Sequence, residues 1–143
     1  MFDRLVVATD GSESVERAVA VALDLADRFD AEVHALTVVD ESQVAALPDE
    51  LGDEVRNALA KQADEALAAV TDRADRDVRT AVREGRPAEE ITGYARAVDA
   101  DCVAMGTRGR GGEHSFRVGS VAEHVVRTCP VPVLTVRHLE TGA

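Results

Sequence analysis

Short apolar runs alternate with helical patterns along the whole 143-residue chain. Most of the runs are rich in Val, Leu and Ala, as is typical of buried parallel strands; the five expected strands lie at 4–9, 31–39, 77–83, 101–105 and 130–136. The spacing between them is helical, at about 13–29, 51–74, from 87 to about 98, and 120–127. Such alternation pairs parallel strands through right-handed helical crossovers. It therefore predicts an α/β fold with one open, doubly wound, five-stranded parallel sheet and helices on both faces.

The expected strand order is 3-2-1-4-5, with residues 1–143 forming a single domain. Because Pro132 cannot donate to a strand ladder, the last strand is placed at an edge of the sheet. In doubly wound sheets, ligands bind beyond the carboxyl ends of the strands, where neighbouring connections leave in opposite directions. For this order the switch point lies between strands 1 and 4, which end near Asp10 and Met105.

A glycine motif begins at the end of the fourth expected strand. Two residues separate Gly106 from Gly109, and nine more, 110–118, precede Gly119 and Ser120. As a strand, a loop and a helix start, this stretch offers backbone N–H groups and a helix dipole that favour an anion. Glycine would also let phosphate oxygens approach closely and would permit positive φ. The alternative is a flexible surface loop, rich in glycine and arginine, that ends in an ordinary helix cap.

Two residues of the expected site also have purely structural explanations. Ser120 and Glu123 have the spacing of a capping box, in which the two side chains satisfy backbone N–H groups at a helix start. Asp10 belongs to a residue type that commonly hydrogen-bonds its own backbone in turns. A capping hydroxyl can still donate its proton to a phosphate, and the switch-point position favours Asp10 as a ligand contact. Both explanations stay open for each residue.

The composition is strongly acidic. A net charge of −11 disfavours nucleic acid as a partner, because that binding needs clustered positive charge. Three Phe, one Tyr and no Trp also leave few rings for stacking bases. Lys61 is the only lysine among the 16 basic residues. Since concentrated salt screens repulsion between carboxylates, one hypothesis is a halophilic source; the alternative is an ordinary acidic cytosolic protein from a GC-rich genome.

The remaining sequence features favour a globular protein in the cytoplasm. No apolar run approaches the roughly 18 residues that span a bilayer, and the amino terminus lacks the layout of a signal peptide. Cys102 is expected in a buried strand and Cys129 at a helix end, and neither has the spacing of a metal site. His34, the lone histidine of its strand, is expected at the surface or at a strand edge rather than as a ligand.

Taken together, these residues resemble the universal stress protein family, specifically its nucleotide-binding branch. The family pattern Gly-x2-Gly-x9-Gly-[Ser/Thr] is met by Gly106, Gly109, Gly119 and Ser120. The resemblance covers nearly the whole chain, including the Thr-Asp-Gly-Ser turn at 9–12 and the closing Cys-Pro-Val-Pro-Val. The stretch 110–114 departs from the family by its richness in glycine, which leaves open whether 110–118 acts as a lid.

The resemblance implies an ATP site at the switch point, with Mg²⁺ accompanying the nucleotide. It implies that Asp10 contacts the ribose or adenine region and that Val38 flanks adenine. The residues implied to line the phosphate path are Met105, Gly106, Thr107, Arg108 and Gly109. Those implied to hold the terminal phosphates are Gly119, Ser120 and Val121, and the expected contacts also include Ala8 and Thr9. Family members commonly pair as homodimers, which implies a dimer here through the last strand, from Val131 to Val136.

The sequence favours an ATP-binding stress sensor or switch over an enzyme. It has no Gly-Lys-[Ser/Thr] P-loop and no evident catalytic constellation, so slow ATP hydrolysis is the most that is expected. A phosphorylated receiver domain would need an acidic pair after the first strand, where Asp10 is alone, and a flavin carrier would need more aromatic residues. The remaining rival is a dimeric stress scaffold that binds a protein partner without nucleotide.

Overall fold

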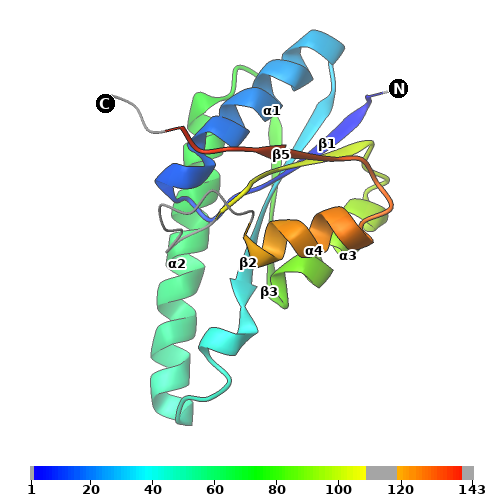
Figure 1. Cartoon of the computed structure of the whole chain (residues 1–143). Coiled ribbons are helices and arrows are strands. Elements are labelled where there is room, and N and C mark those ends of the chain that lie inside the picture. The colour runs from blue at the N-terminus through cyan, green and yellow to red at the C-terminus, as the bar shows by residue number, and fades with distance from the viewer. Residues whose placement is uncertain (1, 109–118, 140–143) are drawn as a thin grey trace.

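The computed structural model describes residues 2–108 and 119–139. Its centre is a parallel sheet with the strand order β3-β2-β1-β4-β5 (Figure 1), which confirms the predicted α/β fold and strand order. The strands are β1 Arg4–Ala8, β2 Glu32–Asp40, β3 Val78–Gly85, β4 Cys102–Gly106 and β5 Val133–Val136.

Helices cover both faces of the sheet, as predicted (Figure 1). Successive side chains of a strand point to opposite faces, so the apolar run of β1 supplies two cores. Leu5 and Val7 pack with α1 and α2 on one face, whereas Val6 packs with α3 and α4 on the other. The helices are α1 Glu16–Phe29, α2 Asp49–Arg73, α3 Pro87–Ala97 and α4 Ser120–Thr128, and two short 3-10 turns are η1 Glu13–Val15 and η2 Glu41–Gln43.

The edges of the sheet are β3 and β5. Most side chains of β3 are exposed or half-buried, as its alternating sequence predicts. β5 begins at Val133, later than predicted, because Pro130 and Pro132 have no N–H to donate to a ladder. The carbonyl of Pro132 still accepts the N–H of Val103 at 2.9 Å. The edge position predicted for the last strand is thus confirmed.

His34 is buried in the interior strand β2, so its predicted position at the surface or a strand edge is wrong. Its Nδ1 lies 2.9 Å from the hydroxyl of Tyr94, a residue of α3. Its Nε2 lies 2.9 Å from the Glu32 carboxylate. Burial, the main cause, raises the pKa of Tyr94 and keeps its phenol neutral. The Tyr94 hydroxyl is the hydrogen-bond partner of Nδ1, whereas the Glu32 carboxylate lies beside Nε2 without the alignment of a hydrogen bond.

The helical spacing of the α1 segment predicts one packed side, and this is confirmed along most of its length; the residues expected there are Val15, Ala18, Ala22, Leu25, Ala26 and Phe29. Val15, Ala18, Ala22 and Ala26 are buried against the sheet. Phe29, expected on the same side, is 54% exposed at the last residue of the helix. Among residues 2–108 and 119–139, no helix combines the length and the apolar character needed to cross a membrane.

Candidate functional site

The carboxyl ends of β1 and β4 lie side by side where the chain leaves the sheet in opposite directions. Val7 of β1 pairs with Ala104 of β4. After β1 the chain continues into α1 on one face, whereas after β4 it continues toward α4 on the other (Figure 1). This is the topological switch point, the position at which doubly wound folds bind ligands.

The turn after β1 is fixed by hydrogen bonds within itself and to β2. The hydroxyl of Thr37 donates to the carbonyl of Thr9 at 2.8 Å. Within the turn, the Asp10 carboxylate accepts the N–H of Ser12 at 2.8 Å, and the Thr9 hydroxyl accepts the N–H of Gly11 at 3.1 Å. Gly11 has φ 77°, a conformation that favours glycine. The turn explanation for Asp10 is therefore confirmed, and it holds the carboxylate at the switch point.

The segment after β4 contacts both the start of α4 and the region that follows β1. The N–H of Gly119 donates to the carbonyl of Thr107 at 2.6 Å. The N–H of Thr107 donates to the carbonyl of Val136 in β5 at 3.3 Å. From η1, the Ser14 hydroxyl donates to the carbonyl of Arg108 at 3.4 Å. The two described ends of the glycine motif thus meet each other and the first loop.

The two described motif glycines are required by the chain's own packing. A Cβ on Gly119 would lie 2.9 Å from the carbonyl oxygen of Thr107. A Cβ on Gly106 would lie 3.2 Å from the carbonyl oxygen of Arg108 and 3.3 Å from that of Ser14. Neither glycine has positive φ, so the interpretation that these two positions need glycine for such a conformation is wrong. Their missing side chains instead let three backbone segments approach one another.

The start of α4 differs from the predicted capping box. Gly119 is the N-cap residue and Ser120 is already the first helical residue, so the serine hydroxyl is not the cap. The side chain of Glu123 pairs with Arg127 one turn later instead of reaching back to the helix start. The first N–H groups of a helix have no acceptor within it. An exposed hydroxyl and these N–H groups therefore meet beside the end of β4.

This architecture is shared with known proteins. Residues 1–137 match the model of the universal stress protein family. The chain belongs to this family. It is 38% identical over 141 residues to a universal stress protein of Methanocaldococcus jannaschii, an alignment that covers 96% of this chain and 83% of the relative.

Solved structures of other universal stress proteins superpose on most of this one. The protein UspA from Lactobacillus plantarum matches with a TM-score of 0.84 at 28% identity, covering 95% of this chain and 98% of that one. A universal stress protein from Archaeoglobus fulgidus, solved in complex with dAMP, matches with a TM-score of 0.64 at 22% identity, covering 96% and 100%. At that identity, the second likeness establishes the shared fold alone.

In this universal stress protein the described residues of the predicted site lie near the carboxyl ends of the strands. They stand at or near the ends of β1, β2 and β4 and in the first turn of α4: Ala8, Thr9, Asp10, Val38, Met105, Gly106, Thr107, Arg108, Gly119, Ser120 and Val121. Gly109 and the stretch 110–118, for which a role as a lid was left open, lie outside the described residues. Ala8 and Met105 are buried in the core, so they can offer a ligand only backbone groups.

Three polar residues that lie near these strand ends were not identified from the sequence. Thr37 and Ser14 tie the first loop to β2 and to Arg108, and their long-range partners give no local signal. Asp40 ends β2, and its carboxylate accepts the N–H of Ser42 at 2.9 Å and the hydroxyl of the same residue at 2.7 Å. The Asp-x-Ser spacing is the one signal that could have marked this turn.

The acidic side chains near the switch point follow or end different strands. Asp10 follows β1 and Asp40 ends β2. Within the part of the chain that the structure describes, no group of three or more His, Cys, Asp or Glu residues could hold a metal ion. Magnesium commonly binds through one or two carboxylates together with phosphates and water. A Mg²⁺ ion here would therefore have few protein ligands and would depend on phosphates and water for most of its coordination.

Proposed function

We propose that this universal stress protein binds ATP, or another adenine nucleotide, at the switch point and acts as a nucleotide-dependent stress sensor. The observation that carries the proposal is the junction of β4 with α4. Gly119, an N-cap without a side chain, is bonded to Thr107, and the exposed hydroxyl of Ser120 follows it. Helix N-termini of this kind bind phosphate through their N–H groups and their dipole.

The proposed roles of the surrounding residues follow from their chemistry. The Ser120 hydroxyl donates to a terminal phosphate oxygen, as do the N–H groups of the first turn of α4. Arg108, at the end of β4, supplies positive charge beside the phosphates. The Asp10 carboxylate accepts a hydrogen bond from the ribose, and Val38 offers apolar surface to the base. Gly109 and Val121 complete the proposed phosphate contacts.

Because the Asp10 carboxylate is assigned to the ribose, a Mg²⁺ ion would be held mainly by phosphate and water oxygens, and it would supply positive charge that neutralises the phosphates. No other acidic side chain stands at the ends of β1 and β4 in the described ranges. A site with so few protein ligands neutralises charge without positioning an attacking water. This is the physical reason to expect at most slow hydrolysis, because phosphoryl transfer depends on positioning the nucleophile as well as on the metal.

The switching part of the proposal uses the contact between the phosphate segment and β5. Thr107 accepts the N–H of Gly119 and donates to the carbonyl of Val136. A ligand that orders Thr107 thereby also favours one arrangement of β5, through which we propose that the homodimer forms. The ligand shifts this equilibrium only by the difference between its affinities for the two arrangements. Nucleotide and dimer are then linked in both directions.

The family supports the choice of nucleotide. The member from Archaeoglobus fulgidus was solved with dAMP, an adenine nucleotide. The present chain has that fold and places a helix start at the switch point. The triphosphate is our own inference, implied by the family resemblance of the glycine motif and supported by the positive charge of Arg108.

The first test is the nucleotide content of the purified protein, followed by titration with ATP and magnesium in high salt. Co-purified adenine nucleotide or saturable ATP binding is expected. The variant Ser120→Ala is expected to bind ATP about ten- to hundredfold more weakly, since a hydrogen bond to a charged group contributes about 1.5–3 kcal/mol. Its fold should be intact because the residue is exposed and is not the N-cap.

The matched control is Thr71→Ala, which removes an exposed hydroxyl from the far end of α2. Its ATP affinity should equal that of the unaltered protein. No binding to the folded protein in high salt would overturn the nucleotide proposal. It would leave the rival function, a dimeric scaffold that binds a protein partner without nucleotide.

A further inference from the structure

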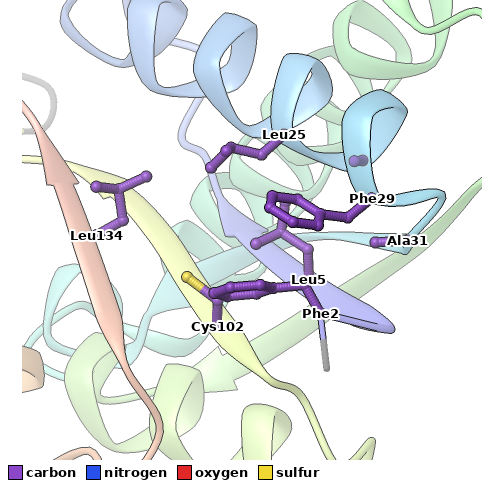
Figure 2. A pocket seen from close by; sticks show the side chains of 8 residues that line it. Phe2, Leu5, Leu25, Phe29, Ala31, Cys102 and Leu134 are labelled. Atoms are coloured by element: carbon purple, nitrogen blue, oxygen red, sulfur yellow. The ribbon is translucent and has the colours of Figure 1, made fainter.

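An apolar hollow lies among the amino-terminal ends of the strands, at the opposite end of the sheet from the switch point (Figure 2). Its volume is about 190 Å³. The lining side chains come from the amino-terminal segment, β1, the end of α1, the start of β2, β4 and β5: Phe2, Leu5, Leu25, Ala26, Phe29, Ala31, Cys102 and Leu134. None of these residues belongs to the proposed nucleotide site.

The cavity has a buried base and an exposed rim. Leu5 and Cys102 are partners across β1 and β4 and are 2% and 6% exposed. At the rim, the rings of Phe2 and Phe29 lie 5.1 Å apart with an interplanar angle of 42°. Figure 2 shows both rings beside the side chain of Leu5. The exposure of Phe29, unexpected from the sequence, is explained by its place in this rim.

The lining defines the chemistry of a ligand. Every lining side chain is apolar, and the thiol of Cys102 is the one heteroatom among them. Burial, the main cause, raises the pKa of this thiol, which therefore stays neutral. Such a lining has no polar group that could replace the hydrogen bonds to water which a charged or strongly polar ligand would lose on binding. Two phenylalanine rings and a sulfur atom favour an aromatic partner through edge, offset and S–aromatic contacts.

The volume defines the size of the ligand. An engineered apolar cavity of roughly 150 Å³ stays dry and binds benzene. The present cavity, at about 190 Å³, is somewhat larger. We propose that it binds a small uncharged aromatic molecule of one or two fused rings, with the rings of Phe2 and Phe29 closing over it. This inference does not depend on nucleotide binding, because the two sites share no residue.

Indole is a suitable probe, since it is uncharged, aromatic and bicyclic. Titrated into the full chain and followed by amide NMR, it is expected to bind saturably with a dissociation constant of about 1 mM or below. Chemical-shift changes should concentrate at Leu5, Ala31 and Cys102 and leave Ser120 unchanged. Shift changes that grow linearly without saturation, or that spread over the whole surface, would overturn the proposal.

Filling the cavity supplies the decisive comparison. Cys102→Leu adds carbon atoms at its base and should weaken indole binding at least about tenfold. The matched control, Cys129→Leu, changes the cysteine that packs on the opposite face of the sheet and should bind indole normally. If Cys102→Leu does not fold, Leu134→Phe fills the cavity from the edge strand and serves the same test. Unchanged binding in a folded cavity-filling variant would exclude the site.

A second copy of the chain is the competing occupant. Its side chains would enter the cavity as protein concentration rises, and the amide shifts of Leu5 and Ala31 would then depend on concentration without indole. That result would overturn the small-molecule assignment. Concentration-independent shifts together with saturable indole binding would support it.

Discussion

Gly119 and Gly93 have opposite surroundings, which makes them a matched pair for testing what the motif glycine does. A Cβ on Gly119 would lie 2.9 Å from a backbone oxygen, whereas a Cβ on Gly93 would meet nothing within 4 Å. We expect Gly119→Ala to lower the free energy of unfolding by about 1–3 kcal/mol, because backbone must move. Gly93→Ala, in the interior of α3, should raise it by about 0.5–1 kcal/mol. Urea denaturation measures both, and equal effects would contradict the packing role of Gly119.

Asp101 is the residue for which the structure gives a pH-dependent prediction. Its carboxylate accepts the N–H groups of Arg4 and Asp3 at 2.9 and 2.7 Å, and these bonds lower its pKa. A pKa lower in the folded than in the unfolded state stabilises the fold at pH values above the unfolded pKa of about 3.9. The stabilisation is lost as pH falls through the folded pKa. Asp101→Asn should therefore be less stable than the unaltered protein near neutral pH and should approach it in acid.

The measurement is urea denaturation over a pH series. Asp64→Asn, which removes an exposed carboxylate from α2, controls for the change in net charge. A constant difference between Asp101→Asn and the unaltered protein at every pH would show that the carboxylate charge is not responsible.

Residue roles were predictable from the sequence only where they depend on near neighbours. The Asp10 turn was anticipated because its partners are within two positions. The capping box was not borne out, because Gly119 becomes the N-cap through its bond to Thr107, on a different element. The burial of His34 depends on Tyr94, sixty positions away in the chain. No local sequence pattern indicates a partner on a different element.

At the scale of elements, β5 allows a test of the proposed homodimer. Backbone N–H groups of a strand alternate between its two sides. The carbonyl of Pro132 accepts the N–H of Val103 in β4, and that of Val136 accepts the N–H of Thr107 just after β4, which places the N–H of Thr135 on the side away from β4. We expect Thr135→Pro to preserve the sheet and to weaken the proposed dimer at least about tenfold, because proline removes an outward donor.

Analytical ultracentrifugation over a concentration series measures this effect. Thr135→Val keeps the N–H and suits a strand, so it should dimerise like the unaltered protein. A dimer of unchanged strength in Thr135→Pro would place the contact elsewhere.

Elements were the most predictable level of this structure. Four apolar runs, three of them buried, and one alternating run sufficed for the strands, because burial on one or both faces dominates their composition. Boundaries moved where a proline limited the ladder, as at the start of β5. Phe29 followed the helical spacing of α1 but lies beyond the packed part, at its last residue. The cavity was not predictable, since four stretches of the chain that are far apart in the sequence contribute to it.

At the scale of the whole molecule, the sheet separates two chemistries. The carboxyl ends of β1 and β4 carry the polar switch point, while the amino ends of the same strands line the apolar cavity. Parallel topology forces this arrangement, because all strands begin at one end of the sheet and finish at the other. The two ends of the sheet can therefore differ in amino-acid composition without altering the shared core.

The charge of the whole molecule leads to a final prediction. With a net charge of −11, repulsion opposes the compact state most strongly at low ionic strength. The screening length falls from about 10 Å at 0.1 M to about 3 Å at 1 M salt. If the protein is adapted to concentrated salt, its melting temperature should rise clearly over this range, and structure should be lost in low salt.

Screening can be separated from the general stabilisation that excluded solutes produce. A variant with Asp64→Asn and Glu65→Gln loses two exposed negative charges from α2 and should depend less on NaCl, while responding to sucrose like the unaltered protein. The reason is that sucrose acts through exclusion from the surface, whereas NaCl acts here through charge. Calorimetry of both proteins in both solutes gives the comparison. Full stability of the unaltered protein in low salt would refute the salt-adaptation hypothesis and leave an ordinary acidic protein.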